Sequence, residues 1–178
     1  MPMERRPIVG VMGSGDREYP DKSEPLGRWL AEVGVNLLTG GGEGVMTAVS
    51  RAFVSVQNRK GASVGVLPAQ QDLGPATYPN RWVEIRIQTH LPLTGEHGSD
   101  PLSRNHINIL SSDVLVALPG SAGTASEVAL AVAYARPLIA FVDTRMDIPG
   151  LDQLPWIPSA GTLLDVQRFV LRNIQIKG

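Results

Sequence analysis

The sequence predicts a single-domain α/β protein spanning residues 1–178, with a Rossmann-like, doubly wound parallel sheet and helices on both faces of that sheet. Short, nearly continuous apolar runs alternate with longer segments of helical periodicity, which is typical of parallel strands buried on both faces. The glycine clusters at 13–15, 40–44 and 120–123 each follow one of these apolar runs. Since the carboxyl ends of parallel strands share one edge of a sheet, we expect a ligand site at that edge.

The composition narrows the class of function. Lys and Arg number 16 and Asp and Glu 17, so the net charge of -1 argues against nucleic acid or an anionic membrane as a partner. The absence of cysteine excludes thiol nucleophiles, zinc–cysteine sites, iron–sulfur clusters and disulfides. The amino-terminal apolar run, about five residues long, is too short for a signal peptide, and no apolar run approaches the length of a membrane span. We therefore predict a cytoplasmic protein.

The first half of the chain predicts three strands and two helices. A β-branched run at 8–12 predicts a strand that ends in a glycine turn. A Ser-Glu-Pro start followed by apolar residues at helical spacing predicts a helix over 23–33. We expect a second strand at 35–38, a helix with an apolar stripe at 45–56, and a third strand at 63–67.

The second half begins with two long loops, at 69–82 and 89–100, which flank a predicted strand at 83–88. Asp100 and Pro101 predict the start of a helix, because aspartate is a favoured N-cap and proline costs no hydrogen bond in the first turn. Further along the chain we expect strands at 114–118 and 137–142, helices at 124–135 and 162–173, and a loop at 143–161.

Several common signatures are missing. The chain has no GxGxxG dinucleotide fingerprint, no GxxxxGK[ST] P-loop, no GxSxG elbow and no HExxH zinc motif. His90, His97 and His106 do not fall at a recognised ligand spacing, so we predict no metal site. Two glycine-rich turns, each opening a helix, remain as candidates for chemistry.

These two turns predict a phosphate cradle. At 39–46 (TGGGEGVM), four glycines in five residues let the backbone approach a ligand closely, and the next helix offers unpaired N–H groups to an anion. At 119–127 (PGSAGTASE), a second glycine turn opens another helix. A purely structural interpretation stands beside this one: Thr124 and Glu127 fit a capping box, and glycines at turns can simply permit positive φ.

Arg104 is the third candidate for a ligand contact. We expect it in the first turn of a helix at the same sheet edge, where its guanidinium could bind phosphate through two parallel hydrogen bonds. The alternative is a solvated arginine or an ion pair. Asn105 and Asn108 are poor helix formers, so each suggests a polar contact. Tyr78 could cover the ring of a ligand or simply pack within its loop.

These motifs resemble those of one superfamily. GGGEGVM is similar to the GGGxxGxM segment, and PGSAGTASE to the PGGxGTxxE signature, of the Lonely Guy or "lysine decarboxylase-like" proteins and the molybdenum-cofactor carrier proteins. Arg104 lies 15 residues before Pro119, where the superfamily places its arginine, and Asp113 matches its aspartate before a strand. The resemblance covers residues 8–142.

The two branches of this superfamily imply different functions. Lonely Guy enzymes are phosphoribohydrolases, which release the base and ribose 5-phosphate from a nucleoside 5′-monophosphate; Arg104 and Glu127 would then be the catalytic pair. Carrier proteins bind a phosphorylated pterin and perform no obvious reaction. Ser103, Asn105 and Ser121 resemble the carrier pattern more closely. We therefore expect a carrier-type protein, with the hydrolase as the alternative.

In either branch the resemblance implies a phosphorylated pterin- or purine-like ligand, with molybdenum cofactor as a possible bound ligand and no further cofactor required. It also implies a homodimer or homotetramer, and loops at 69–82 and 89–100 that close over the ring of the ligand. The residues predicted to contact the ligand are Gly13, Ser14, Gly41, Gly42, Gly44, Arg104, Asn105, Gly120, Ser121, Gly123 and Thr124.

Overall fold

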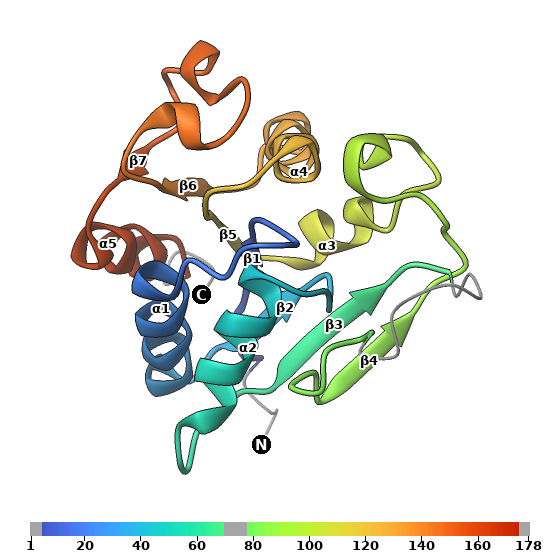
Figure 1. The fold of residues 1–178 in the computed structure, drawn as a ribbon. Coiled ribbons are helices and arrows are strands. Elements are labelled where there is room, and N and C mark those ends of the chain that lie inside the picture. Colours follow the sequence, from blue (N-terminus) through green and yellow to red (C-terminus); the bar gives the residue numbers. More distant parts are fainter. Residues whose placement is uncertain (1–4, 70–77, 175–178) are drawn as a thin grey trace.

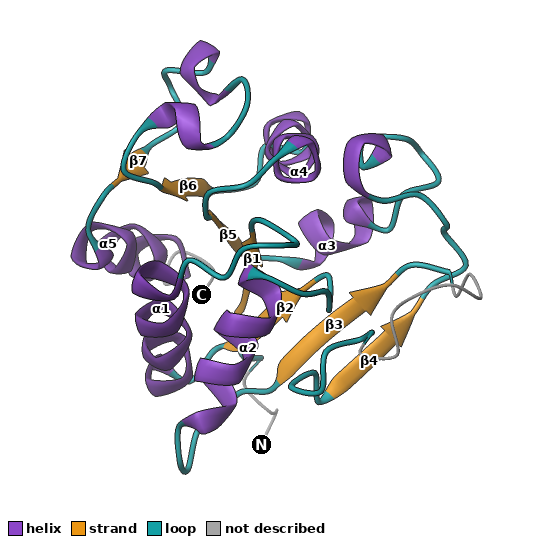
Figure 2. Ribbon diagram, in the orientation of Figure 1, coloured by secondary structure: helices purple, strands orange, loops and turns teal. Residues whose placement is uncertain are grey.

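The computed structural model describes residues 5–69 and 78–174, and Figure 1 shows how its elements are arranged. Within these residues seven parallel strands form one sheet in the order β4-β3-β2-β1-β5-β6-β7 (Figure 2). The strands are β1 (Ile8–Met12), β2 (Asn36–Thr39), β3 (Ser63–Leu67), β4 (Ile85–Gln88), β5 (Val114–Ala117), β6 (Leu138–Phe141) and β7 (Ser159–Ala160).

Helices cover both faces of the sheet. They are α1 (Pro20–Val33), α2 (Val45–Ser55), α3 (Asn105–Ser111), α4 (Ala122–Ala133) and α5 (Leu163–Ile174), with short 3-10 turns η1 (Gly95–His97), η2 (Arg145–Asp147) and η3 (Leu151–Gln153). Helices α1, α2 and α5 lie on one face, and α3 and α4 on the other (Figure 1). The predicted Rossmann-like, doubly wound fold is thus confirmed. None of the helices described is long and apolar enough to cross a membrane.

Alternation along the central strands divides the core into two layers. Val9 and Val11 of β1 are buried in the layer shared with α1, α2 and α5. Leu115 and Ala117 of β5 are buried in the layer shared with α3 and α4. Because helices cover both faces, the central strands bury nearly every side chain, which explains their continuous apolar runs.

The direction of strand addition reverses beside β1. The chain proceeds from β1 to β2, β3 and β4, and then returns to the other side of β1, where β5 pairs with it from Val9↔Val114 to Met12↔Ala117. The chain then leaves β1 toward α1 on one face and leaves β5 toward α4 on the other. Such a reversal opens a crevice at the carboxyl ends of the strands, where ligands bind in this fold class.

The helix predicted to begin at Pro101 begins instead at Asn105. Asp100 does cap, but it caps a separate turn: its side chain accepts a hydrogen bond from the Leu102 N–H at 2.9 Å. Ser103 then forms an isolated parallel bridge with Leu93, and this bridge keeps residues 101–103 out of the helix. Arg104 consequently becomes the N-cap of α3 rather than a residue in its interior.

Two other boundaries also differ from the predictions. Helix α1 begins at Pro20, and Ser23 is no N-cap, because its hydroxyl donates back to the carbonyl oxygens of Glu18 and Tyr19. The predicted loop at 143–161 contains β7, which pairs with β6 through Phe141↔Ala160. Two residues are too few to leave a periodic signal in the sequence.

Gly27 brings α1 and α2 into close contact, and substituting it should destabilise the fold. A Cβ at this position would overlap the Val49 carbonyl oxygen and lie 3.0 Å from the Ala52 methyl. Because backbone cannot move aside cheaply, we expect Gly27→Ala to lower the free energy of unfolding by about 1–3 kcal/mol, despite the better helix propensity of alanine. Denaturant unfolding measures this. Gly161→Ala is the control, since its new methyl would meet nothing closer than 3.8 Å; equal losses in both variants would contradict the prediction.

Candidate functional site

A pocket of about 390 Å³ lies at the carboxyl ends of the central strands, next to the reversal beside β1. Its wall combines the turns that follow β1, β2, β3 and β5 with Tyr78, the loop that follows β4 and the start of α3. Eight of the residues singled out from the sequence lie in this wall: Gly13, Gly42, Arg104, Asn105, Ser121, Gly123, Thr124 and Glu127. Segments distant in sequence thus converge where the glycine turns predicted a site.

Four predicted contacts lie outside the wall and support it instead. The Ser14 N–H donates to the Pro119 carbonyl at 2.9 Å, and its own carbonyl accepts from the Val45 N–H at 2.9 Å, so Ser14 ties the turns after β1, β2 and β5 together. Gly44 has φ +60°, and a Cβ there would lie 2.8 Å from the Gly15 carbonyl carbon. Gly41 faces Leu67 and Pro79, and Gly120 faces the side chain of Thr124. Close packing thus accounts for these glycines, and contact of the four residues with a ligand stays a prediction.

The segment 78–80 fixes the glycine turn after β2. The Tyr78 hydroxyl donates to the Gly40 carbonyl at 2.9 Å. The Asn80 N–H donates to the Gly41 carbonyl at 2.8 Å, and the Asn80 side-chain amide to the Gly42 carbonyl at 2.9 Å. The carbonyl groups of Gly40, Gly41 and Gly42 therefore all accept hydrogen bonds from Tyr78 and Asn80. The turn is rigid, as a binding cradle requires.

Arg104 is a buried cation in the pocket wall, with a residue exposure of 7%. One of its terminal nitrogens, Nη1, donates to Asn105 Oδ1 and lies 4.0 Å from Glu127 Oε1. Its Nε has no hydrogen-bond partner among the described residues. The guanidinium lies over Gly40, where a Cβ would come within 2.7 Å of Arg104 Cζ. A buried guanidinium with a donor to spare is suited to an anionic ligand.

Glu127 lies in the second turn of α4 and enters the pocket beside Arg104. The capping-box interpretation of this residue is wrong: the N-cap of α4 is Ser121, and no side chain caps that helix end. Burial raises the pKa of Glu127 from 4.5 to about 7, although Arg104 and a side-chain hydrogen bond from Asn108 oppose the rise. The carboxyl group is therefore partly protonated at neutral pH and can both donate and accept a proton.

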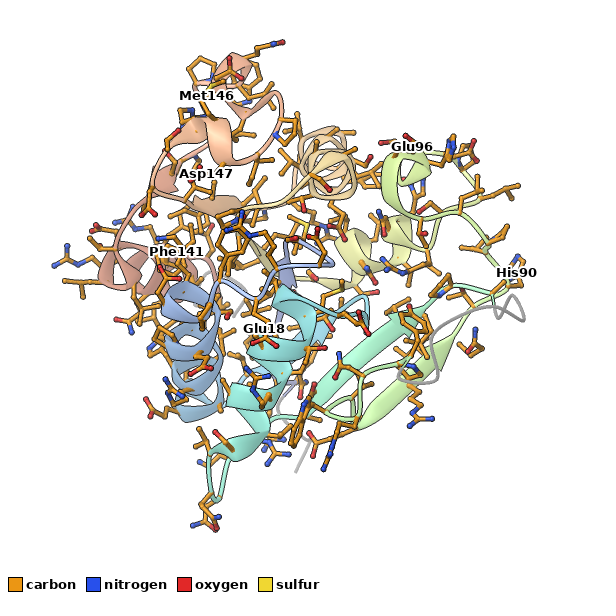
Figure 3. All side chains as sticks on the ribbon, in the orientation of Figure 1. Glu18, His90, Glu96, Phe141, Met146 and Asp147 are labelled. Carbon is orange, nitrogen blue, oxygen red and sulfur yellow. The ribbon has the colours of Figure 1, made fainter. Side chains whose placement is uncertain are left out.

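The histidines do not converge on the pocket. His90 and Glu96 lie at the outer edge of the molecule (Figure 3), and His97 is also exposed. His106 contacts the Tyr134 hydroxyl at 2.7 Å and the Asp100 carbonyl at 2.9 Å. Within 5–69 and 78–174, no three His, Asp or Glu side chains come together in a group that could hold a metal ion.

Comparison with known proteins identifies the family. A model of the SLOG cluster4 family matches residues 6–153, which include both glycine turns, Arg104 and Glu127. The chain belongs to the SLOG cluster4 family. This SLOG protein is also 34% identical over 126 residues to an uncharacterised protein of Archaeoglobus fulgidus, covering 70% of this chain and 72% of that relative.

Solved structures similar to this SLOG protein include two molybdenum cofactor proteins. The molybdenum cofactor binding protein from Rippkaea orientalis is 30% identical, with a TM-score of 0.75 over 96% of this chain and 98% of that one. The Moco carrier protein from Chlamydomonas reinhardtii is 30% identical, with a TM-score of 0.69 over 94% of this chain and 99% of that one. The resemblance drawn from the glycine motifs, including its carrier branch, is confirmed.

Sequence reasoning did not single out seven residues of the pocket wall, and it left the role of Tyr78 open. The seven residues are Met12, Gly15, Glu43, Met46, Pro68, Thr94 and Gly95. Thr94 and Gly95 come from the loop expected to close over the ring, and Gly95 packs against Gly123, 3.3 Å from where a Cβ of Gly123 would lie. Part of the other loop, residues 70–77, lies outside the described residues. Met46 belongs to the apolar stripe of its helix, so nothing in the sequence separated it from the core.

Proposed function

We propose that this SLOG protein binds a phosphorylated pterin- or purine-like small molecule, as a carrier of the molybdenum cofactor type. The observation that carries the proposal is the buried Arg104 guanidinium, which faces a pocket built from two glycine turns and the amino termini of α2 and α4. Backbone N–H groups at helix starts and a guanidinium fork are the donors that phosphate prefers. The similar proteins from Rippkaea orientalis and Chlamydomonas reinhardtii support the pterin ligand.

The rest of the pocket suits a flat ring. Tyr78, Met46 and Pro68 line one side, where Tyr78 is anchored through its hydroxyl to Gly40. A volume of about 390 Å³ lies within the range of small-molecule sites. Apolar and aromatic side chains in the same wall as the phosphate-binding groups would receive a heterocycle by stacking and dispersion contacts.

Gly42→Val tests this pocket without removing a charge. A Cβ at Gly42 would lie 2.7 Å from Met46 Cε, the end of a flexible side chain, so the fold should survive while the pocket narrows. We expect affinity for molybdenum cofactor, measured by anaerobic titration calorimetry, to fall by about tenfold or more. Gly161→Val, far from the pocket wall, should bind as the wild type does. Unchanged affinity in Gly42→Val, or no binding by the wild type, would refute the carrier proposal.

Glu127 favours the phosphoribohydrolase as a second candidate. A carboxyl group whose pKa lies near 7, beside a guanidinium 4.0 Å away, can stabilise an oxocarbenium-like transition state or transfer a proton. Incubation with a panel of nucleoside 5′-monophosphates, followed by mass spectrometry for free base, tests this function. Base release that disappears in Glu127→Gln would establish the hydrolase. No release from any nucleotide would leave the carrier.

Two expectations remain. We propose a cytoplasmic protein, on the amino-acid sequence, that assembles as a homodimer or homotetramer, on the superfamily resemblance. Sedimentation equilibrium would test the assembly. Neither nucleic acid nor a resident cofactor is part of the proposed function.

A further inference from the structure

A second, much smaller cavity lies behind the pocket. Its volume is about 10 Å³, about the space that one water molecule occupies. Asn108 and Glu127 line it together with Thr39 and Ser112, among apolar residues of β1, β2 and β5. Glu127 therefore lines both the ligand pocket and this small cavity.

Asn108 is the polar residue of this cavity that the proposed function does not explain. It is 3% exposed, and its Oδ1 has no hydrogen-bond partner among the described residues. Asparagine is a poor helix former, and a buried polar atom without a partner costs stability. A residue such as leucine would therefore suit both the helix and the apolar surroundings better, so the fold alone gives no reason for an asparagine here.

Helix α3 directs two polar side chains at Glu127. Arg104 and Asn108 are four residues apart, a spacing that places both on one face of a helix. Arg104 Nη1 lies 4.0 Å from Glu127 Oε1, and the Asn108 side chain lines the small cavity with Glu127 and lowers the pKa of its carboxyl group. Ser112 fixes the end of α3 by donating to the Asn108 carbonyl at 2.8 Å.

We propose that Asn108 is a positioning residue, which holds the Glu127 carboxyl group in the pocket in both of its protonation states. The side-chain amide carries both a donor and an acceptor. Its N–H donates to the charged carboxylate, and after a half-turn of the amide its oxygen accepts from the neutral carboxyl group. Arg104 has no acceptor, so it cannot receive the hydrogen bond that the neutral carboxyl group donates. The bond to the charged form is the stronger of the two, so loss of Asn108 favours the neutral form.

The other titratable groups around Glu127 are few. In the part of the chain that the structure describes, Arg104 at the start of α3, Glu43 at the start of α2 and Tyr78 share the pocket with it. The small cavity adds no titratable group beyond Glu127 itself. These groups stay in place when Asn108 is replaced, so a change in the titration of Glu127 reports on Asn108.

The test is the titration of Glu127 in ligand-free protein, followed by the ¹³C shift of its carboxyl carbon, with Glu127→Gln identifying the signal. We expect Asn108→Leu to raise the titration midpoint by about half a pH unit or more without lowering the midpoint of denaturant unfolding. Asn108→Asp, which keeps the shape but removes the donor and adds a like charge, should raise the titration midpoint further, because the added charge repels the carboxylate. If the leucine variant does not fold, Asn108→Met, which removes the same donor without adding a charge, decides the question.

Asn36→Leu is the matched control. Asn36 accepts a hydrogen bond from the Ala62 N–H at 3.0 Å, far from the pocket, so its loss should lower stability and leave the Glu127 titration unchanged. An unchanged Glu127 midpoint in folded Asn108→Leu, or in Asn108→Met where the leucine variant does not fold, would overturn the proposal. The inference concerns the site of the proposed function, but the titration needs no ligand. It therefore stands or falls separately from phosphate binding.

Discussion

Replacing Arg104 with methionine should weaken binding of molybdenum cofactor, or of any phosphate monoester that the pocket accepts, by about ten- to 100-fold. The guanidinium is buried in the pocket wall and keeps one donor, Nε, without a partner among the described residues. Hydrogen bonds between a buried cation and phosphate are worth about 1.5–3 kcal/mol, which corresponds to roughly ten- to 100-fold in affinity. Titration calorimetry on both proteins measures the difference.

One control makes this measurement specific. Arg28→Met removes an exposed arginine whose partner is Glu24 on the same helix, and its affinity should equal that of the wild type. Methionine at 104 retains much of the side-chain volume, and Glu127, which loses its cationic neighbour, can become neutral, so the variant should stay folded. If the folded variant keeps wild-type affinity, Arg104 is not the phosphate ligand.

Replacing Glu127 with glutamine should stabilise the protein above pH 7 by about 3 kcal/mol relative to the wild type. Burial holds the folded-state pKa at about 7, above its ordinary value of 4.5. A carboxyl group with a raised folded-state pKa stabilises the fold fully below pH 4.5, and this contribution is lost as the pH rises through about 7. Glutamine cannot ionise and keeps the neutral form at every pH. The two proteins should therefore be equally stable near pH 4 and diverge above it.

Denaturant unfolding between pH 4 and pH 8 measures this divergence, and Glu84→Gln provides a control of opposite sign. Burial alone would raise the pKa of Glu84, but hydrogen bonds from Arg59 and the Ser63 N–H outweigh it and leave the pKa lowered. This carboxylate stabilises the fold above its unfolded pKa, and its contribution is lost as the pH falls, so Glu84→Gln should be the less stable protein at neutral pH. A stability difference for Glu127→Gln that is flat with pH would show that folding does not shift the pKa of Glu127.

Local sequence patterns were sufficient to predict a structural element wherever a physical signal repeats along the chain. The five strands predicted from apolar runs all exist, because strands covered on both faces must be apolar at nearly every position. The strand predicted from alternation at 83–88 exists as β4, an exposed edge strand. The glycine turns after β2 and β5 were also visible, because close backbone approach excludes a Cβ. By contrast, β7 and the observed start of α3 could not be predicted from the sequence. A two-residue strand and a bridge between Leu93 and Ser103 both depend on partners that are distant in the sequence.

The candidate site divides in the same way. The sequence determined which residues could meet an anion: the glycine turns, Arg104 and Glu127 all stand in recognisable local motifs. Only the tertiary structure decided that Glu127 enters the pocket instead of capping α4, and that Tyr78 and Asn80 hold the glycine turn. Only packing decided that Asn108 meets Glu127. Motifs record what the backbone of one segment requires, whereas burial and charge pairing arise only where distant segments meet.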